Sequence, residues 1–192
     1  MIAAVHGHSR VATLLLDRGA DVSKVDEGLT VLHISAASGH LAMTEMLMTA
    51  GANPEARSNE GATPLHLAMA EGYLEVMKAM VKAGVNVDRR GPGGATPLYA
   101  AASDGLLDIV EVLLGANANP LLTVPNAVTG GPPLVPLDAA ARGGHVAVVR
   151  RMVGKLGIEG CDGATLGVSA LYQAAKNQQV DVMAILVNSR SD

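Results

Sequence analysis

The chain has 192 residues, of which 49% are hydrophobic and 17% are charged, and this composition excludes an intrinsically disordered protein. A formal net charge of −4 argues against nucleic-acid binding, which needs a basic surface, and a single cysteine excludes an internal disulfide. The apolar runs are too short to span a bilayer and the first residues lack a signal-peptide pattern, so we expect an intracellular, cytoplasmic protein without a membrane partner.

The N-terminal segment is a loose copy of a pattern that becomes regular from residue 28 onward. It reads IAAVHGHSRVATLLLDRGAD from Ile2, and its Gly7 lies one residue closer to the next copy than the later spacing predicts. This copy lacks a turn and most of a first helix, so we expect a partial repeat over about residues 1–24. The apolar residues expected to be partly exposed at this end are Val11, Leu14 and Leu15.

Three copies then follow in phase. They read GLTVLHISAASGHLAMTEMLMTAGANP from Gly28, GATPLHLAMAEGYLEVMKAMVKAGVNV from Gly61 and GATPLYAAASDGLLDIVEVLLGANANP from Gly94. Two sets of residues recur at one constant step, namely Thr30, Thr63 and Thr96, and Gly39, Gly72 and Gly105. A fixed period of about 33 residues is typical of repeat proteins in which every copy is one structural unit.

The copy from Gly61 shows the local structure that each copy encodes. Thr63 can cap a helix, and Pro64 is tolerated at its first position. The sequence predicts a short helix to residue 70, a left-handed glycine at Gly72 that ends it, and a second helix over 74–82 with one apolar face. In the next copy Asn117 replaces the glycine that ends the second helix, and asparagine also tolerates the left-handed conformation.

The period is interrupted at residues 120–136. Pro120 and Pro136 lie farther apart in the sequence than Pro54 and Pro64, which stand at the matching places of a regular copy. The spacing resumes in register afterwards, so the extra residues enlarge one loop and do not separate two domains. The insertion is either harmless, since closure costs grow slowly with loop length, or a contact site. The apolar residues that favour a contact site are Leu121, Leu122, Val124, Val128 and Leu134.

Two looser copies follow, PLDAAARGGHVAVVRRMVGKLG from Pro136 and SALYQAAKNQQVDVMAILVN from Ser169. Terminal copies of a repeat protein normally have a polar outer face, but both terminal copies here are rich in apolar residues. Two explanations are open: the chain belongs to a longer array, or its ends associate weakly with other copies of the chain. The residues expected to be partly exposed at the second end are Val182, Ile185 and Leu186.

The complete motif Thr63-Pro64-Leu65-His66 with Ala68, repeated with a period of about 33 residues, resembles the ankyrin repeat family. Near copies are Thr96-Pro97-Leu98-Tyr99 and Thr30-Val31-Leu32-His33, and the resemblance covers about nine tenths of the chain. It implies an all-α solenoid of about five to six stacked helix-turn-helix units with β-turn fingers, whose concave face is formed by the fingers and the first helices. We expect one ankyrin repeat domain over 1–192, with repeats at about 1–24, 25–57, 58–90, 91–123, 124–161 and 162–192.

Histidine and cysteine are the residue types that suggest metal binding or catalysis. Most histidines take places fixed by the repeat, namely His33 and His66 in the motif, and His8, His40 and His145 after the central glycine. The resemblance implies that such rings bond the backbone between turns and neighbouring repeats, and that Tyr99 replaces a motif histidine. His6 and His8 lack further ligands at metal-site spacing, and Cys161 lacks a base in sequence. We therefore expect no metal, no cofactor and no catalytic residues.

The resemblance also implies where a partner would bind, because contacts in ankyrin relatives come from finger tips and exposed first-helix positions. Lys24, Arg57 and Arg90 recur at the same constant step, so we expect them in a row with a spacing of about 10 Å. An enlarged loop at 120–136 would project to the concave side or fold back over the fifth repeat. The finger positions are Lys24, Asp26, Glu27, Arg57, Asn59, Glu60, Arg89 and Arg90, and the first-helix positions are Glu71, Ser103, Asp104 and Arg142.

These positions predict a groove of mixed charge that holds a partner protein or an extended peptide with an acidic stretch. The alternative is ordinary solvation, because lysine and arginine are the usual exposed residues. The sequence therefore predicts a non-catalytic protein–protein interaction scaffold. A structural spacer within a longer array is the alternative function, and a metal-binding or enzymatic protein is a further one that finds less support in the sequence.

Overall fold

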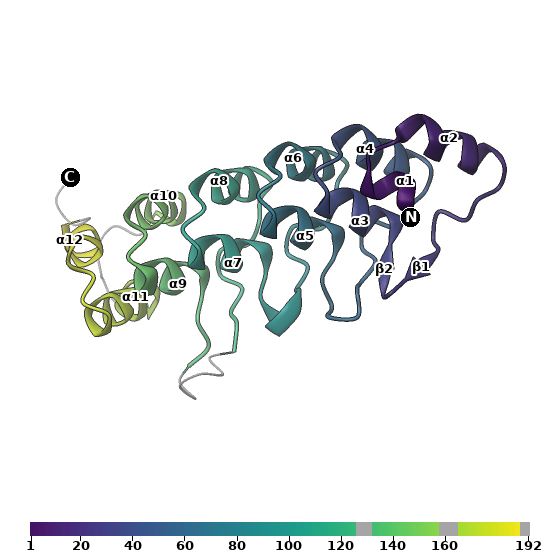
Figure 1. Ribbon diagram of the computed structural model, residues 1–192. Helices are drawn as coiled ribbons and strands as arrows, with labels where there is room; N and C mark the ends of the chain where they lie inside the picture. The colour runs from purple at the N-terminus through teal and green to yellow at the C-terminus, as the bar shows by residue number, and fades with distance from the viewer. Residues whose placement is uncertain (126–131, 158–164, 189–192) are drawn as a thin grey trace. The chain divides into compact units, whose positions relative to one another are not determined.

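The computed structural model describes residues 1–125, 132–157 and 165–188, and it divides into two compact units, Met1–Gly93 and Gly94–Asp192. Both units consist of helical hairpins, in which a short first helix and a second helix run antiparallel (Figure 1). Loops connect each second helix to the next first helix. Within each unit the first helices lie side by side in one layer and the second helices in another (Figure 1). This is the stacked all-α arrangement that the sequence predicts.

The first unit contains three hairpins and a short β-ribbon. Its elements are α1 (Ile2–Val5), α2 (Ser9–Asp17), β1 (Val25–Asp26), β2 (Leu29–Thr30), α3 (Val31–Ala37), α4 (Leu41–Thr49), α5 (Pro64–Ala70) and α6 (Leu74–Lys82). The ribbon is antiparallel and pairs Val25 with Thr30 and Asp26 with Leu29. Glu27 and Gly28 form its tip, both with positive φ, because a two-residue turn that follows the twist of the strands needs left-handed residues.

The described part of the second unit also contains three hairpins. A 3-10 turn, η1 (Pro92–Gly94), precedes them. The helices are α7 (Pro97–Ser103), α8 (Leu107–Gly115), α9 (Pro136–Gly143), α10 (Val146–Leu156), α11 (Thr165–Lys176) and α12 (Val180–Asn188). No helix in the part of the chain that the structure describes is long and apolar enough to cross a membrane.

Local signals place the helix ends where the sequence predicts them. The helix predicted to end at residue 70 begins at Pro64, and Gly72 follows it with φ +74°. The second helix, over 74–82, is confirmed in full. Asn117 has a φ of 60°, so it does take the place of the helix-ending glycine.

The motif histidine completes a cap at the start of the first helix. The hydroxyl of Thr30 accepts from the backbone N–H of His33 over 3.4 Å, and Nδ1 of His33 accepts from the backbone N–H of Thr30 over 3.2 Å. Because Nδ1 is an acceptor, Nε2 carries the proton and donates to the carbonyl oxygen of Ala62 over 3.1 Å. One ring thus caps its own helix and ties it to the next loop. Thr63 and His66 form the same capping box in α5.

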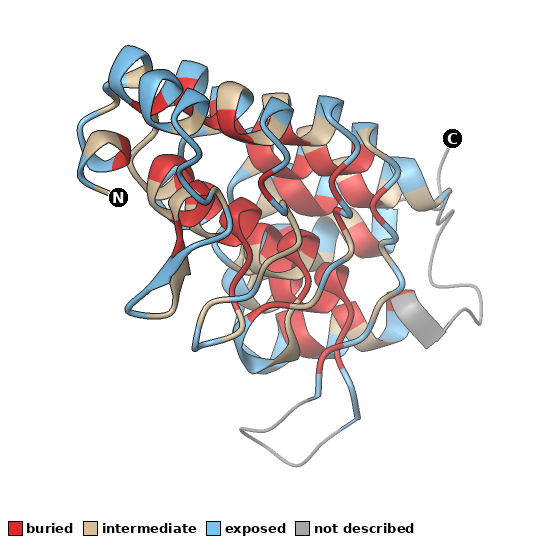
Figure 2. Ribbon diagram, turned by 90° about the vertical axis from the view of Figure 1, so that its right-hand side faces the viewer, coloured by how far each residue is buried: buried red, intermediate tan, exposed pale blue. Residues whose placement is uncertain are grey.

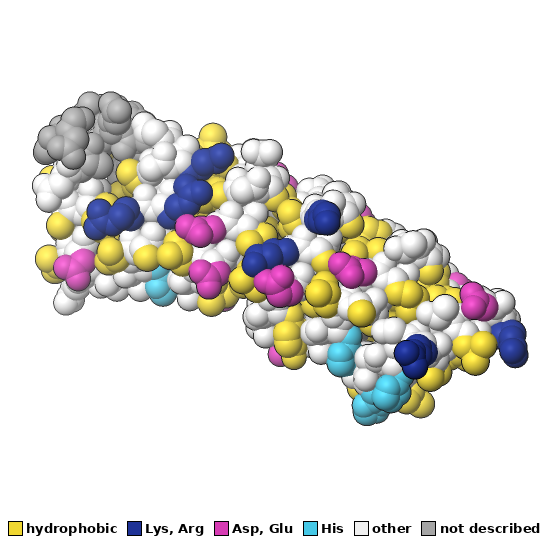
Figure 3. All heavy atoms as spheres, turned by 90° about the horizontal axis from the view of Figure 1, so that it is seen from above, with side chains coloured by type: hydrophobic (Ala, Val, Ile, Leu, Met, Phe, Trp, Pro, Cys, Tyr) yellow, Lys and Arg dark blue, Asp and Glu magenta, His cyan; other side chains and the backbone are white. Residues whose placement is uncertain are grey.

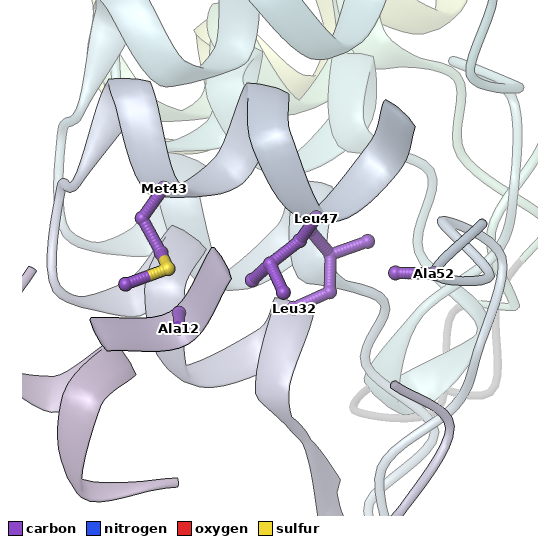
Figure 4. Close-up of a cluster of buried hydrophobic side chains, with 5 residues drawn as sticks. All are labelled: Ala12, Leu32, Met43, Leu47 and Ala52. Atoms are coloured by element: carbon purple, nitrogen blue, oxygen red, sulfur yellow. The ribbon is translucent and has the colours of Figure 1, made fainter. Parts of the chain in front are cut away.

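Each unit buries thin layers of aliphatic side chains. The leucine of the motif is fully buried in both units, at Leu32, Leu65, Leu98 and Leu137. In the first unit Leu32 packs in a cluster with Met43, Leu47, Ala12 and Ala52 (Figure 4). The facing sides of the helices are buried and the loop tips are exposed (Figure 2). Small layers of this kind need no large aromatic residue, in line with a sequence that lacks phenylalanine and tryptophan.

The enlarged loop has a paired neck. Val124 and Leu134 exchange two backbone hydrogen bonds, of 2.7 and 2.9 Å, and form an antiparallel bridge. Val124 is 7% exposed and Leu134 is 2% exposed. The sequence-based prediction that these two residues are exposed contacts is therefore wrong, because the bridge turns both side chains into the core. Residues 126–131 lie outside the described residues, so the direction of the loop stays a prediction.

Candidate interaction surface of the finger loops

The finger loops of the first unit, at residues 18–30, 50–63 and 83–93, place most of the predicted contact residues at the surface. Arg90 is half-buried. The exposed ones are Lys24, Asp26, Glu27, Arg57, Asn59, Glu60 and Arg89. The first two fingers lead into first helices that are anchored by the buried Leu32 and Leu65.

Neighbouring fingers of this unit contact each other through the predicted residues. The Arg57 guanidinium donates to the backbone carbonyl of Arg90, so two residues that occupy the same place in consecutive repeats are adjacent in space. Asn59 lies against Gly28 so closely that a Cβ at Gly28 would overlap its amide. Lys24 belongs to the same series by sequence, and the regular spacing of all three cations stays a prediction.

Glu55 joins the second finger to the third. Its Oε1 accepts from the backbone N–H of Asn86 over 2.9 Å, and its Oε2 lies 3.7 Å from Nε of Arg89. Exposed ion pairs of this kind add little to stability, but they orient the side chains involved. Arg89 and Arg57 therefore both have a structural role, which the sequence analysis did not predict.

The acidic first-helix positions lie at helix C-termini. Glu71 is the C-cap of α5 and Asp104 is the C-cap of α7, and both are exposed. A carboxylate at a helix C-terminus is unfavourable, because the helix dipole is negative there. Neither acid is therefore explained by helix stability. Ser103 and Arg142, the other two predicted positions, are half-buried.

The apolar residues of the enlarged loop divide into two groups. Leu121 is 50% exposed and Leu122 is half-buried, so both remain available as contacts. Val124 and Leu134 belong to the buried neck. Val128 lies outside the described residues.

The remaining histidines hold neighbouring repeats together. The ring of His40 lies over Gly7, and its Nε2 is 2.9 Å from the carbonyl of Val5. His145 repeats the arrangement in the second unit, over Gly105 and 2.8 Å from the carbonyl of Ser103. A glycine is needed below each ring because a Cβ there would collide with it.

His6 and His8 are neighbours, with ring centroids 5.8 Å apart. Across residues 1–125, 132–157 and 165–188, no group of three or more histidine, cysteine, aspartate or glutamate side chains is placed to hold a metal ion. Cys161 lies outside the described residues.

Sequence reasoning missed a cavity of about 370 Å³ at the N-terminal end of the first unit. Leu15 and Leu16 of α2 line it, together with Val31 and Leu47 of the next hairpin.

Comparison with protein families agrees with the repeat pattern. A family model described as ankyrin repeats (3 copies) matches residues 50–124. A second model, described as ankyrin repeats (many copies), matches residues 1–48. No individual curated protein matches the chain. The matched segments include both complete and near copies of the motif.

Proposed function

Because the chain belongs to the ankyrin repeat family, whose repeats generally mediate protein–protein interaction, we propose that it is a non-catalytic scaffold for a partner protein or peptide. The proposed site comprises the finger loops and the exposed ends of the first helices. The partner is an extended segment with an acidic stretch.

The pair formed by Arg57 and Arg90 is the observation that carries this proposal. Two cationic residues are held side by side at the finger tips by a side-chain to backbone hydrogen bond. This arrangement limits the freedom of the Arg57 side chain before a partner arrives, which lowers the entropic cost of binding. Positive charge there also steers an acidic segment toward the fingers.

The exposed acids at the C-caps support the same proposal. Glu71 and Asp104 occupy equivalent places in consecutive repeats, and each sits where the helix dipole disfavours a carboxylate. A role in recognition explains why a residue type that costs stability stands at both places. Glu71, which belongs to the same unit as the cationic fingers, would select partners whose segment carries a cation beside its acidic stretch.

Affinity capture with charge-reversed variants tests the proposal. The wild type and Arg57→Glu/Arg90→Glu are immobilised, captured proteins are identified by mass spectrometry, and a peptide from the captured partner is titrated directly. We expect the variant to bind that peptide at least tenfold more weakly. Arg150→Glu/Lys155→Glu, an equal charge change on the exposed face of α10, is the matched control and should bind like the wild type.

The same experiment separates the scaffold from a structural spacer. A spacer has its partner sites elsewhere, so a peptide that binds both charge-reversed variants and the wild type equally would contradict the role of the finger tips. Figure 3, which looks down on the second helices, shows cationic and anionic side chains interspersed there. That mixed surface makes the α10 variant a suitable control.

A further inference from the structure

The second helix of the first repeat exposes positions that later repeats bury. In α4, α6, α10 and α12 the third and seventh residues are at most 2% exposed, and each of these helices packs on the preceding second helix of its own unit. In α2 the same positions are Val11 and Leu15, which are 49% and 50% exposed. These two residues form what we call the N-face. The buried counterparts are Met43, Leu47, Val76, Met80, Val148, Met152, Val182 and Leu186. The expectation that Val182 and Leu186 are partly exposed is therefore wrong, because both face the preceding second helix α10.

The last repeat exposes the complementary set. The fourth motif position is 0% exposed at His33 and 2% exposed at Asp138, where a following first helix packs on it, but 61% exposed at Tyr172. Ala175 is exposed, and its counterparts Ala36 and Ala141 are fully buried. Met183 is half-buried, whereas its counterpart Val149 in α10 is fully buried. Tyr172, Ala175 and Met183 form the C-face.

We propose that the N-face of one copy of the chain binds the C-face of a second copy. Inside each unit, neighbouring repeats meet layer by layer: second helices pack on second helices, and first helices pack on first helices. By the same register the N-face meets the Met183 part of the C-face, and α1 of that copy meets Tyr172 and Ala175. The cavity beside the N-face, lined in part by Leu15, leaves room for an incoming side chain. This contact concerns the ends of the chain and does not rest on the finger loops.

A contact between two different faces has a recognisable consequence. Each copy that joins through its N-face still presents its own C-face, so association continues beyond the dimer as concentration rises. A contact between two identical N-faces would instead stop at the dimer. The distribution of species therefore reports which faces meet.

Sedimentation velocity over a concentration series tests the proposal on the full chain. We expect the wild type to form a concentration-dependent series of oligomers. Val11→Glu/Leu15→Glu and Tyr172→Glu/Ala175→Glu should each be monomeric, and all four positions are exposed, so both variants should fold. The matched control Thr13→Glu/Arg18→Gln makes the same change in net charge at two exposed polar positions, one in α2 and one at its C-cap, and should associate like the wild type.

Mixing the two monomeric variants gives the decisive result. The N-face variant retains an intact C-face and the C-face variant retains an intact N-face, so a mixture should form one-to-one dimers and nothing larger. The proposal fails if the wild type is monomeric at every concentration, or if the mixture stays monomeric. It also fails if the C-face variant alone dimerises, because identical N-faces would then be in contact. Circular dichroism of each variant confirms that loss of association is not loss of the fold.

Discussion

Asp138 occupies the motif position that histidine holds in other repeats. Its Oδ2 accepts from the backbone N–H of Val135 over 2.9 Å, so a carboxylate replaces the imidazole as the cap of α9. The side chain is 2% exposed, and this burial raises the pKa of Asp138 above its ordinary value. Hydrogen bonds from Val135 and from Ser169 favour the charged form and oppose part of this rise. The folded chain therefore retains this proton to a higher pH than the unfolded chain does.

This raised pKa predicts how stability depends on pH. As pH rises above the ordinary value of 3.8, the unfolded chain releases the proton first, so the contribution of Asp138 to stability falls until its folded-state pKa is passed. Asp138→Asn keeps an acceptor for Val135 and cannot ionise. We expect the variant to become more stable relative to the wild type as pH rises from acidic to neutral. Thermal melts across this range measure the difference, and parallel pH profiles would contradict the prediction.

His33 makes contacts on both sides of its ring and is fully buried. Removing the ring by His33→Ala leaves the N–H of Thr30 and the carbonyl of Ala62 without this partner, which should cost about 3 kcal/mol. Burial also lowers the pKa of His33, so the wild type should lose stability as pH falls below 6.5, where the unfolded chain takes up the proton first. His33→Ala should lack this loss.

Denaturant unfolding at several pH values checks both parts of the His33 prediction. His8→Ala is the control, because His8 is exposed and its removal should change stability by less than about 0.5 kcal/mol. Equal unfolding free energies for the two variants would mean that the buried ring of His33 adds nothing to stability.

At the scale of single elements, the enlarged loop contains both residues that stabilise the fold and residues that do not. Leu134 is 2% exposed in the paired neck, whereas Leu121 is 50% exposed. Leu134→Ala should therefore destabilise the protein by about 2–3 kcal/mol, and Leu121→Ala by less than about 0.5 kcal/mol. Chemical denaturation measures both. Similar losses of unfolding free energy for both substitutions would contradict the prediction that the buried neck stabilises the fold.

Removal of residues 126–131 complements these substitutions. The deletion shortens the loop to the length of a regular finger and retains Val124 and Leu134. Since the entropy of loop closure changes slowly with length, the unfolding free energy should change by less than about 1 kcal/mol. A partner that still binds the shortened chain would exclude residues 126–131 as a contact site. Loss of folding would show that the loop is not a simple insertion.

The elements also show how far the sequence predicts the fold. Helix boundaries such as Pro64–Ala70 were predictable because cap, proline and glycine signals lie within the helix or beside it. The bridge between Val124 and Leu134 was not, because pairing across a loop leaves no local signal and apolar residues in a loop look exposed. The repeat period predicted only that Arg57 and Arg90 lie in one row. Their hydrogen bond is side-chain detail that spacing does not contain.

On the scale of the whole molecule, neighbouring hairpins within each unit supply one another's buried surface. Stability in such proteins depends on contacts between adjacent repeats, so the end repeats open first. The first hairpin has a four-residue first helix, an exposed N-face and a cavity beside it. Backbone amides of α2 should therefore exchange hydrogen faster than those of α4, whose counterpart positions Met43 and Leu47 are buried.

Hydrogen exchange measured by mass spectrometry at low and high protein concentration tests this order together with end-to-end association. At low concentration we expect α2 and α12 to exchange before α3 and α9. At high concentration, protection of α2 and α12 should rise together, because one contact covers both ends, while α3 and α9 stay unchanged. Exchange of α3 before α2 would contradict the proposed order of opening. Protection that rises in α2 alone would point to contact between identical N-faces, since only that arrangement leaves the last repeat uncovered.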